Sequence, residues 1–484
     1  MLVLLVIPLV LALLGLAHWY VWRRLVRDVT RPGSGPRRAG TAAAFVLPLL
    51  ALGALTAGRA GFPFRLQQVV SWPGFLWLAT LLYLVLALLV TEALRPVLLR
   101  LPARAGRRPA PAGPAAPAEF SAPAEPVAAG ARPAGAHGGS LRPRGAEAPG
   151  EPTPGGPAGS PAADAAPRGG AAPSSAPQGG TALATAPAED PPAVVREEEP
   201  RTGEDAGPGM PRRLFVSRVL AVTATAAAVG TVAHGAHTVL RGPAVKRVTV
   251  PLAKLPRSAH GYRIAVVSDI HLGPTLGRAH AQRIVDAVNS TQPDLIAVVG
   301  DLVDGSVENL GPAAEPLARL RARHGSFFVT GNHEYFSGAE EWVEEVRDLG
   351  LRPLRNERVE IAAGFDLAGV NDVAGENYGD GPDFVRALGD RDRARTAVLL
   401  AHQPVMIHDA VRHGVDLQLS GHTHGGQLWP GNLLAELANP TVAGLEQYGD
   451  TQLYVSRGAG AWGPPVRVGA PSDITVVELA SRHA

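Results

Sequence analysis

The chain has 484 residues, with 45 lysines and arginines against 43 aspartates and glutamates, so its formal net charge is only +2. This near-neutral balance argues against a protein that coats nucleic acid. The absence of cysteine excludes disulfides, thiolate zinc sites, iron–sulfur clusters and a cysteine nucleophile.

The N-terminal region, residues 1–100, contains three apolar runs, at about residues 2–20, 42–57 and 75–94. The first run ends in an aromatic cluster at Trp19 and Tyr20, and arginines follow it rather than precede it. This order argues against a cleaved signal peptide and favours a membrane span with an interfacial anchor. The sequence therefore predicts a helical transmembrane region.

Residues 101–212 are rich in alanine, proline and glycine, and Phe120 is their only aromatic residue. Such a segment cannot bury enough apolar area to offset the entropy of ordering, so we expect a disordered linker. A further apolar run at residues 219–232, within the segment 213–240, follows Arg212 and Arg213. This segment is expected to be a fourth span or a signal-like segment of the twin-arginine type.

The distribution of arginine predicts the topology. Six arginines lie between residues 23 and 38, after the first run, whereas only Arg59 and Arg65 follow the second. Arginines also follow the third run and precede the fourth. The positive-inside rule then places the first loop and the linker in the cytoplasm, and the C-terminal domain on the extracytoplasmic side. If the fourth segment does not cross, the domain is cytoplasmic.

From about residue 246 to residue 484, short apolar runs alternate with helical patterns, which predicts one folded α/β domain. The helical patterns include Ile284 to Val288 and Trp342 to Leu349, and Gly350 is a plausible helix stop. The expected buried strands are Arg263–Ser268, Leu295–Val299, Ser326–Val329, Ala397–Ala401 and Leu417–Ser420.

Metal-ligating residue types follow each expected strand, where the chain leaves the sheet and loops converge. We expect Asp269 and His271, and likewise His422 and His424, to face one point because alternate residues of an extended segment point the same way. A mixed set of carboxylates, an amide and imidazoles suits manganese, iron or zinc better than calcium. The strand-end clusters are Asp269 and His271, Asp301 and Asp304, Asn332 to Glu334, His402, and His422 and His424.

The ordered motifs DxH, GDxxD, GNHE, a single His and GHTH resemble those of the calcineurin-like metallophosphoesterase superfamily. The segment GHTHGGQ, which begins at Gly421, is similar to its membrane-associated branch of YkuE-like and YaeI-like proteins. The resemblance covers residues 269–424 and implies a four-layer αββα sandwich. It also implies two divalent metal ions, with manganese the leading candidate and iron or zinc the alternatives.

Carried over to this sequence, the resemblance implies two metal sites that share Asp301. It also implies that Asn332 and His333 contact the substrate and that His333 protonates the leaving group, which is work suited to an imidazole. A shared carboxylate would hold two cations about 3.5–4 Å apart, close enough to activate a water between them. The implied ligands are Asp269, His271, Asp301 and His424 for one metal and Asp301, Asn332, His402 and His422 for the other.

The residues next to these ligands have less defined roles. Asp304 and Glu334 are expected either to orient the imidazoles or to form capping and surface hydrogen bonds. Arg457 and Arg467 are candidates for phosphate binding, but ordinary surface charge is the preferred interpretation. Six other histidines are expected to be surface residues or hydrogen-bonded core residues: His260, His280, His324, His408, His413 and His483.

Two positions depart from the family pattern without removing a ligand. Gln403 follows His402 where relatives often have asparagine, and Asp473 lies in a Pro-Ser-Asp-Ile segment where Pro-Glu-Ile is expected. The complete ligand set argues against an inactive copy.

The preferred functional hypothesis is a multi-pass, membrane-tethered phosphoesterase that cleaves a phosphodiester or pyrophosphate bond. Its expected partners are membrane lipids and a phosphoester substrate, with a lipid-linked or envelope-derived compound the attractive candidate, and no nucleic acid. One alternative is a nucleotide phosphodiesterase or nuclease. Another is a membrane scaffold with a metal-binding sensor domain, although the spans lack the buried charge pairs of a transport path.

Overall fold

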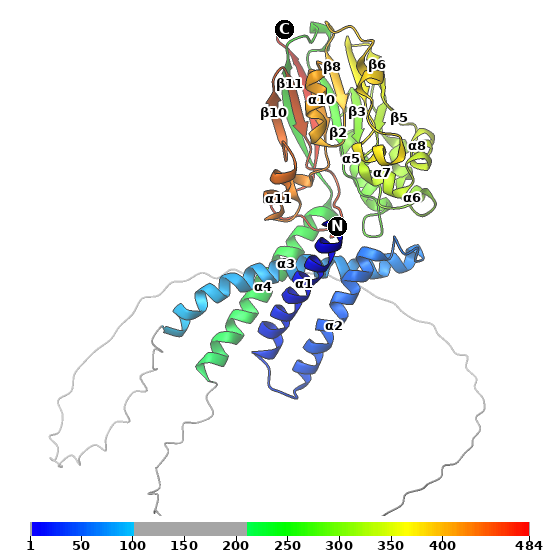
Figure 1. The fold of residues 1–484 in the computed structure, drawn as a ribbon. Coiled ribbons are helices and arrows are strands. Elements are labelled where there is room, and N and C mark those ends of the chain that lie inside the picture. Colours follow the sequence, from blue (N-terminus) through cyan, green and yellow to red (C-terminus); the bar gives the residue numbers. More distant parts are fainter. Residues whose placement is uncertain (1, 101–210, 484) are drawn as a thin grey trace, which may run out of the picture. The chain divides into compact units, whose positions relative to one another are not determined.

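A computed structural model of the protein describes residues 2–100 and 211–483. The described residues form four long apolar helices and an α/β domain (Figure 1). Almost all of the predicted linker, residues 101–212, lies outside the described residues. The domain boundaries therefore stay a prediction.

Each of the four long helices contains a segment that is long and apolar enough to cross a membrane. The helices are longer than the apolar runs because flanking polar residues continue the helical backbone. A short π-helical stretch, η1 (Arg23–Arg27), extends the first of them. The four are α1 (Leu2–Trp22), α2 (Gly35–Thr56), α3 (Phe64–Arg100) and α4 (Arg212–Arg241).

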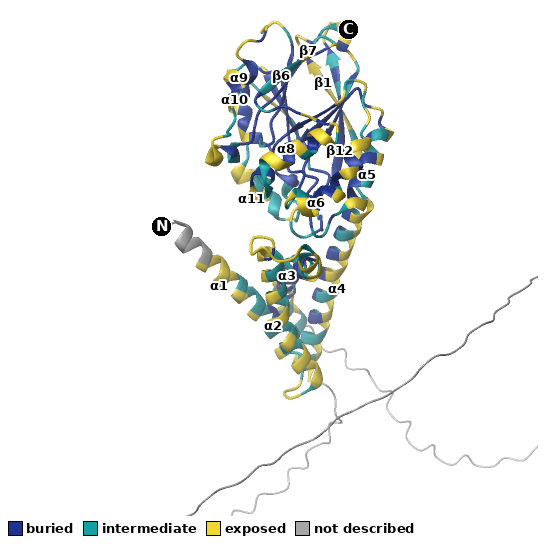
Figure 2. Cartoon of the chain, turned by 90° about the vertical axis from the view of Figure 1, so that its right-hand side faces the viewer, coloured by how far each residue is buried: buried dark blue, intermediate teal, exposed yellow. Residues whose placement is uncertain are grey.

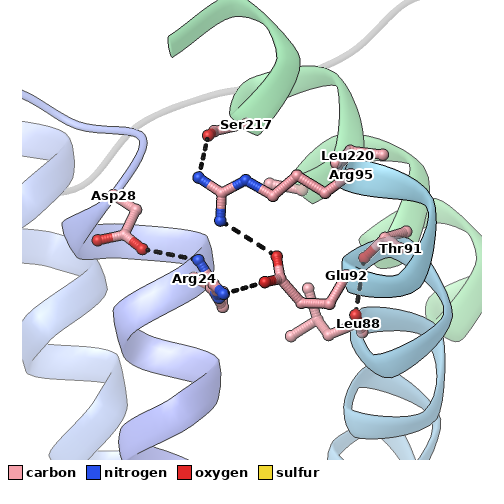
Figure 3. A pocket seen from close by; sticks show the side chains of 9 residues that line it. Arg24, Asp28, Leu88, Thr91, Glu92, Arg95, Ser217 and Leu220 are labelled. Carbon is pink, nitrogen blue, oxygen red and sulfur yellow. Dashed lines mark hydrogen bonds and ion pairs between the residues drawn. The ribbon is translucent and has the colours of Figure 1, made fainter. Parts of the chain in front are cut away.

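The arginine-rich ends of α1, α3 and α4 are joined by a polar cluster around a small pocket (Figure 3). Arg24 donates a hydrogen bond to Asp28 over 3.2 Å and another to Glu92. Arg95 donates to Glu92 over 3.2 Å and to the hydroxyl of Ser217 over 3.4 Å. One carboxylate thus links two helices, and Arg95 reaches the third.

The α/β domain contains two six-stranded sheets. In the first sheet, β2 to β5 are parallel, β12 runs antiparallel to β2, and β1 is parallel to β12. Its strand order is β1 (Ala244–Leu252), β12 (Asp473–Ser481), β2 (Tyr262–Val267), β3 (Leu295–Val299), β4 (Ser326–Val329) and β5 (Arg352–Pro353).

In the second sheet, β7, β8, β9 and β11 are parallel, and the edge strands β6 and β10 are antiparallel to their neighbours. Parallel strands buried on both faces are typical of α/β layers. The strand order is β10 (Gly444–Tyr448), β11 (Thr451–Val455), β9 (Leu417–Ser420), β8 (Ala397–Leu400), β7 (Phe365–Gly369) and β6 (Glu357–Ile361).

The core consists of one apolar layer between the sheets and one outside each sheet. The inner layer joins residues of both sheets, such as Ile264 and Leu367. Outside the first sheet lie α5 (Arg278–Ser290), α6 (Val307–Ala314) and α8 (Ala339–Asp348), and outside the second lie α9 (Phe384–Leu388) and α10 (Ile407–Arg412). Figure 2 shows the strands buried between outward-facing exposed helix surfaces. The predicted αββα sandwich is confirmed.

Two short helices follow the strand ends that carry the motifs. They are α7 (Asn332–Ser337), which follows β4, and α11 (Gly431–Ala438), which follows the GHTH segment. All five expected strands are present, and three of them have the expected bounds.

Candidate metal centre

The candidate site lies at the carboxyl ends of parallel strands in both sheets. Because these ends meet at one edge of the sandwich, residues far apart in sequence come together there. The segments that follow β2, β3, β4, β8 and β9 carry, in that order, Asp269 and His271, Asp301 and Asp304, Asn332 and His333 at the start of α7, His402, and His422 and His424.

The backbone at the site is left-handed at five candidate ligands. Asp269, His271, Asp301, His422 and His424 have φ between 49° and 73°, and they are five of the eight non-glycine residues with positive φ in the described chain. Each such residue costs roughly 1–3 kcal/mol and persists only where its surroundings enforce it. The expectation that extended backbone aligns the paired ligands is therefore wrong, because tight left-handed turns aim these side chains.

Two glycines make room for this arrangement. A Cβ on Gly421 would lie 1.8 Å from Ser268 Oγ and 2.3 Å from Asp269 Oδ2. A Cβ on Gly331 would lie 2.3 Å from Asp301 Oδ1. No side chain larger than hydrogen fits at either place without displacing a carboxylate.

The first group of donors is Asp269, His271 and His424, whose ligand atoms lie within 4.8 Å of one another. The Nε2 atoms of His271 and His424 are 3.0 Å apart, and His424 Nε2 lies 3.4 Å from Asp269 Oδ1. Asp301 Oδ2 lies 3.8 Å from His271 Nε2. The four residues expected at one metal therefore converge.

The second group is Asp301, His402 and His422, again within 4.8 Å of one another. His402 Nε2 lies 3.2 Å from Asp301 Oδ2. His422 Nδ1 is 3.1 Å from Asn332 Oδ1, which brings the amide into this group. Asp301 lies between the two groups, where the bridging ligand is expected. The roles of these residues as ligands stay a prediction.

Asp304 and a backbone carbonyl orient three imidazoles at the site. A carboxylate only accepts hydrogen bonds, so the 2.9 Å contact to Asp304 Oδ1 places a proton on His271 Nδ1. His333 Nδ1 also lies 2.7 Å from Asp304 Oδ1. His402 Nδ1 donates to Val299 O over 2.9 Å. These contacts turn the Nε2 atoms of His271 and His402 toward the site.

Burial and charge keep the other two imidazoles neutral. Burial and the nearby His402 lower the pKa of His422 to about 4, and burial and Arg467 lower the pKa of His424. Burial opposes ionisation of Asp301, but the surrounding imidazoles, His402 first, hold the pKa of this carboxyl below its usual range.

The imidazoles of His271 and His402 differ from these two. Burial opposes their protonation, but Asp304 raises the pKa of His271 to about 9, and Asp301 raises the pKa of His402 well above its usual value. A metal ion requires neutral imidazoles, so cation binding would displace the protons that His271 and His402 carry.

The interpretation of Arg467 as an ordinary surface charge is wrong, because this side chain is only 2% exposed. Its guanidinium donates to the carbonyl oxygens of Gly460 and His424 over 2.9 Å and of Arg457 over 2.6 Å. Its Nη2 lies 3.0 Å from His424 Nδ1. Arg467 thus fastens the loop after β11 to a candidate ligand.

The two acidic neighbours differ in role. Asp304 contacts two imidazoles, as one of its expected roles required. Glu334 instead accepts hydrogen bonds from the backbone amides of Asp301, Leu302 and Gly331 over 3.0, 2.7 and 2.6 Å. It therefore fixes the turn that carries the candidate bridging carboxylate.

His280 does not follow the expectation for unassigned histidines. It is buried on α5, and neither ring nitrogen has a hydrogen-bond partner among the described residues. Burial, followed by Arg283, lowers its pKa to about 3. It is a neutral core side chain.

Three residues near the site were missed from sequence. Asp372, which follows β7, is buried and accepts a hydrogen bond from Gln403 Nε2 over 2.9 Å. The rings of Trp462 and Phe336 lie 5.7 and 5.5 Å from that of His333. The Val-Asn-Asp sequence after the apolar run ending at Val370 is the signal that marks Asp372 as another strand-end acid.

The donor set fits a divalent cation. His402 Nε2 is fully buried and has no hydrogen-bond partner among the described residues, although it faces a carboxylate. Two further Nε2 atoms meet at 3.0 Å. Imidazole nitrogens, carboxylates and an amide oxygen at one point form a transition-metal donor set. A two-sheet sandwich with this set at its strand ends defines a metallophosphoesterase-type protein.

Comparisons with known proteins agree with this class. The family model for calcineurin-like phosphoesterase matches residues 262–426. A Danio rerio protein named "Transmembrane protein with metallophosphoesterase domain" is 39% identical over 279 residues, covering 55% of this chain and 61% of that protein. An Aquifex aeolicus protein, an "Uncharacterized metallophosphoesterase", is 35% identical over 49% of this chain and 92% of its own length.

YkuE of Bacillus subtilis is 29% identical over 49% of this chain and 85% of its own length. The chain belongs to the calcineurin-like phosphoesterase family, whose members use divalent metals. It spans about three fifths of the length of the transmembrane relatives it matches.

Proposed function

We propose that the protein is a membrane-tethered phosphoesterase that uses two divalent cations, manganese first, to hydrolyse a phosphodiester or pyrophosphate bond. The observation that carries the proposal is the position of Asp301 between two donor groups. Residues Asp269, His271 and His424 would hold one cation with Asp301, and Asn332, His402 and His422 would hold the other. When bound, the cations would supply activation of water and stabilisation of phosphoryl charge.

The residues of the chain have separate tasks in this reaction. His333 lies beside the donor groups, and its Nδ1 faces Asp304. With both ring nitrogens protonated, the Nδ1 proton would face Asp304 and Nε2 would give its proton to the leaving oxygen, which leaves a neutral ring. The backbone amide of His333 donates to Asp301 Oδ1 over 2.9 Å and so holds that carboxylate in place. Asn332 would contact both a cation and the substrate.

The membrane topology is also proposed from the helix ends. The polar cluster of Arg24, Glu92, Arg95 and Ser217 gathers the basic ends of α1, α3 and α4 on one side, and arginines favour the cytoplasmic side. The catalytic domain follows the opposite end of α4, at Arg241. This supports an extracytoplasmic catalytic domain in a multi-pass protein. A reporter fused after the C-terminus that is active only in the cytoplasm would contradict it.

The chemistry is tested with purified full-length protein in detergent, stripped of metal with a chelator and supplied with Mn²⁺, Fe²⁺ or Zn²⁺. We expect metal-dependent hydrolysis of an aryl phosphodiester. Hydrolysis of soluble nucleotides in preference to lipid phosphoesters would favour the nucleotidase alternative. Absence of turnover with every metal, by a folded protein that binds metal, would refute the hydrolase proposal and favour the sensor alternative.

A further inference from the structure

Helix α11 lacks the buried side that a surface helix of a domain in water normally has. None of its residues is buried. Leu433, Leu434 and Leu437 are 55%, 71% and 85% exposed, and Glu436 is the only charged residue of the helix. Clustered exposed leucines mark a surface that contacts another apolar medium.

Two tryptophans extend this surface. Trp429 lies two residues before α11. The backbone of Trp462 is hydrogen-bonded to Gln427, two residues before Trp429: the Gln427 side chain accepts from the amide of Trp462 over 3.0 Å and donates to its carbonyl over 2.8 Å. Both indole rings are more than half exposed. Tryptophan favours the boundary between lipid and water, because its ring is apolar and its N–H is polar. Trp429, Leu433, Leu434, Leu437 and Trp462 are called the α11 patch below.

The segments that carry the α11 patch contact the candidate membrane spans. Tyr83 of α3 donates a hydrogen bond to Trp429 O over 3.0 Å. Leu428 and Val468 pack in one apolar cluster with residues of α3 and α4, including Leu84 and Ala228. The chain next to the α11 patch therefore packs against the candidate spans α3 and α4.

The α11 patch also adjoins the metal centre. Only four residues separate His424 from Trp429, and the ring of Trp462 lies 5.7 Å from that of His333. A surface that touches lipid at the patch would bring phosphate headgroups next to the candidate general acid.

We propose that the α11 patch inserts into the lipid bilayer surface and holds the metal centre at the headgroup level, so that the substrate is an amphiphilic phosphoester taken from the membrane. The substrate class rests on the proposed phosphoesterase function, whereas lipid insertion does not. Exposed leucines flanked by tryptophan are the composition of helices that lie in the membrane interface.

Lipid insertion is tested without any activity measurement. The chain has no cysteine, so Leu434→Cys in the full-length protein accepts a single nitroxide label. In vesicles of phosphatidylcholine and phosphatidylglycerol, we expect the label to be relaxed by oxygen, which dissolves in lipid, more than by an aqueous nickel complex. The matched control is Val385→Cys on α9, which is 70% exposed and for which we expect the reverse order.

Equal access of the nickel complex to positions 434 and 385 would overturn the proposal. Protection of position 434 that is lost when each vesicle holds fewer protein molecules would overturn it too, because that result assigns the patch to a second copy of the chain.

The substrate class is tested by replacing Leu433, Leu434 and Leu437 together with glutamine. We expect hydrolysis of an aryl phosphodiester anchored in vesicles to fall about tenfold, because the substrate loses its high local concentration. Hydrolysis of the soluble aryl phosphodiester should not change. The control changes two exposed valines, Val385 and Val411, to glutamine and should affect neither substrate.

Equal losses on both substrates would refute a role in lipid presentation. If the wild-type protein hydrolyses neither substrate, the proposed function fails, and the nitroxide measurement still decides whether the patch inserts.

Discussion

The sandwich edge that carries the candidate metal centre and the long apolar helices place their side chains in opposite surroundings. At the edge, Asp269 and His402 are fully buried and their surroundings are polar and tightly packed. On α2, Phe45 and Leu49 are exposed, and Ala51 is the only buried residue of that helix. At the edge, close neighbours restrict which side chains fit. On the helices, few neighbours contact the exposed side chains, so the surrounding medium restricts them instead.

The largest expected effect is that of Asp301→Asn, which keeps the size of the side chain and removes the charge shared by both donor groups. We expect hydrolysis to fall by about 10³-fold or more, measured with the metal-reconstituted full-length protein. Bound metal should fall as well. Circular dichroism checks the fold.

The matched control for this variant is Asp409→Asn on α10, where the carboxylate pairs with Arg412 at the surface. It should retain wild-type turnover. Near-normal activity of Asp301→Asn would refute the proposal that Asp301 bridges the two cations.

The second prediction compares a buried aromatic residue with one that is exposed on a candidate membrane span. Trp342 is fully buried, and its Nε1 donates to Gly305 O over 2.8 Å. Trp342→Ala should lower the free energy of unfolding by about 3–5 kcal/mol, because a large cavity remains. Phe45→Ala should cost less than about 1 kcal/mol. Denaturant unfolding in detergent measures both, and equal costs would contradict the comparison.

The third prediction compares two glycines. Gly421→Ala would force a Cβ against Ser268 and Asp269. We expect it to lower the free energy of unfolding by about 1–3 kcal/mol and to weaken metal binding. Gly230→Ala on α4 meets nothing within 4 Å and should be neutral or slightly stabilising, since alanine favours helix. Metal titration and thermal unfolding give the two readouts. Wild-type metal affinity in Gly421→Ala would contradict the prediction, because it would show that the site accommodates a Cβ at position 421.

The smallest expected effect concerns the polar cluster of the helix ends. Glu92→Gln removes the carboxylate that both Arg24 and Arg95 contact. Because these side chains are only partly buried, we expect about 1 kcal/mol of lost helix-bundle stability, measured as unfolding in a titration with sodium dodecyl sulfate. The control Glu308→Gln on α6 should leave the helix bundle unchanged. An unchanged midpoint for Glu92→Gln would show that apolar packing alone holds the bundle.

The fold was predictable where a local pattern matched the final environment. The strands β3 and β4 are short and largely apolar runs of buried residues, so their bounds followed from composition. Strands β7 and β11 were not predicted; Asp366 and Gln452 interrupt their apolar runs, as Gln418 does in the predicted strand β9. The half-exposed edge strands β6 and β10 lack a continuous apolar run as well.

The sequence by itself determined the apolar runs, the order of the motifs and the identity of the candidate ligands, because these depend on residue type and spacing along the chain. Only the tertiary structure decided that Asp301 lies between two donor groups, that Arg467 is buried against His424, and that Glu334 holds a backbone turn. Such contacts join loops from different strands, and their left-handed backbone is stable only when the surrounding packing enforces it.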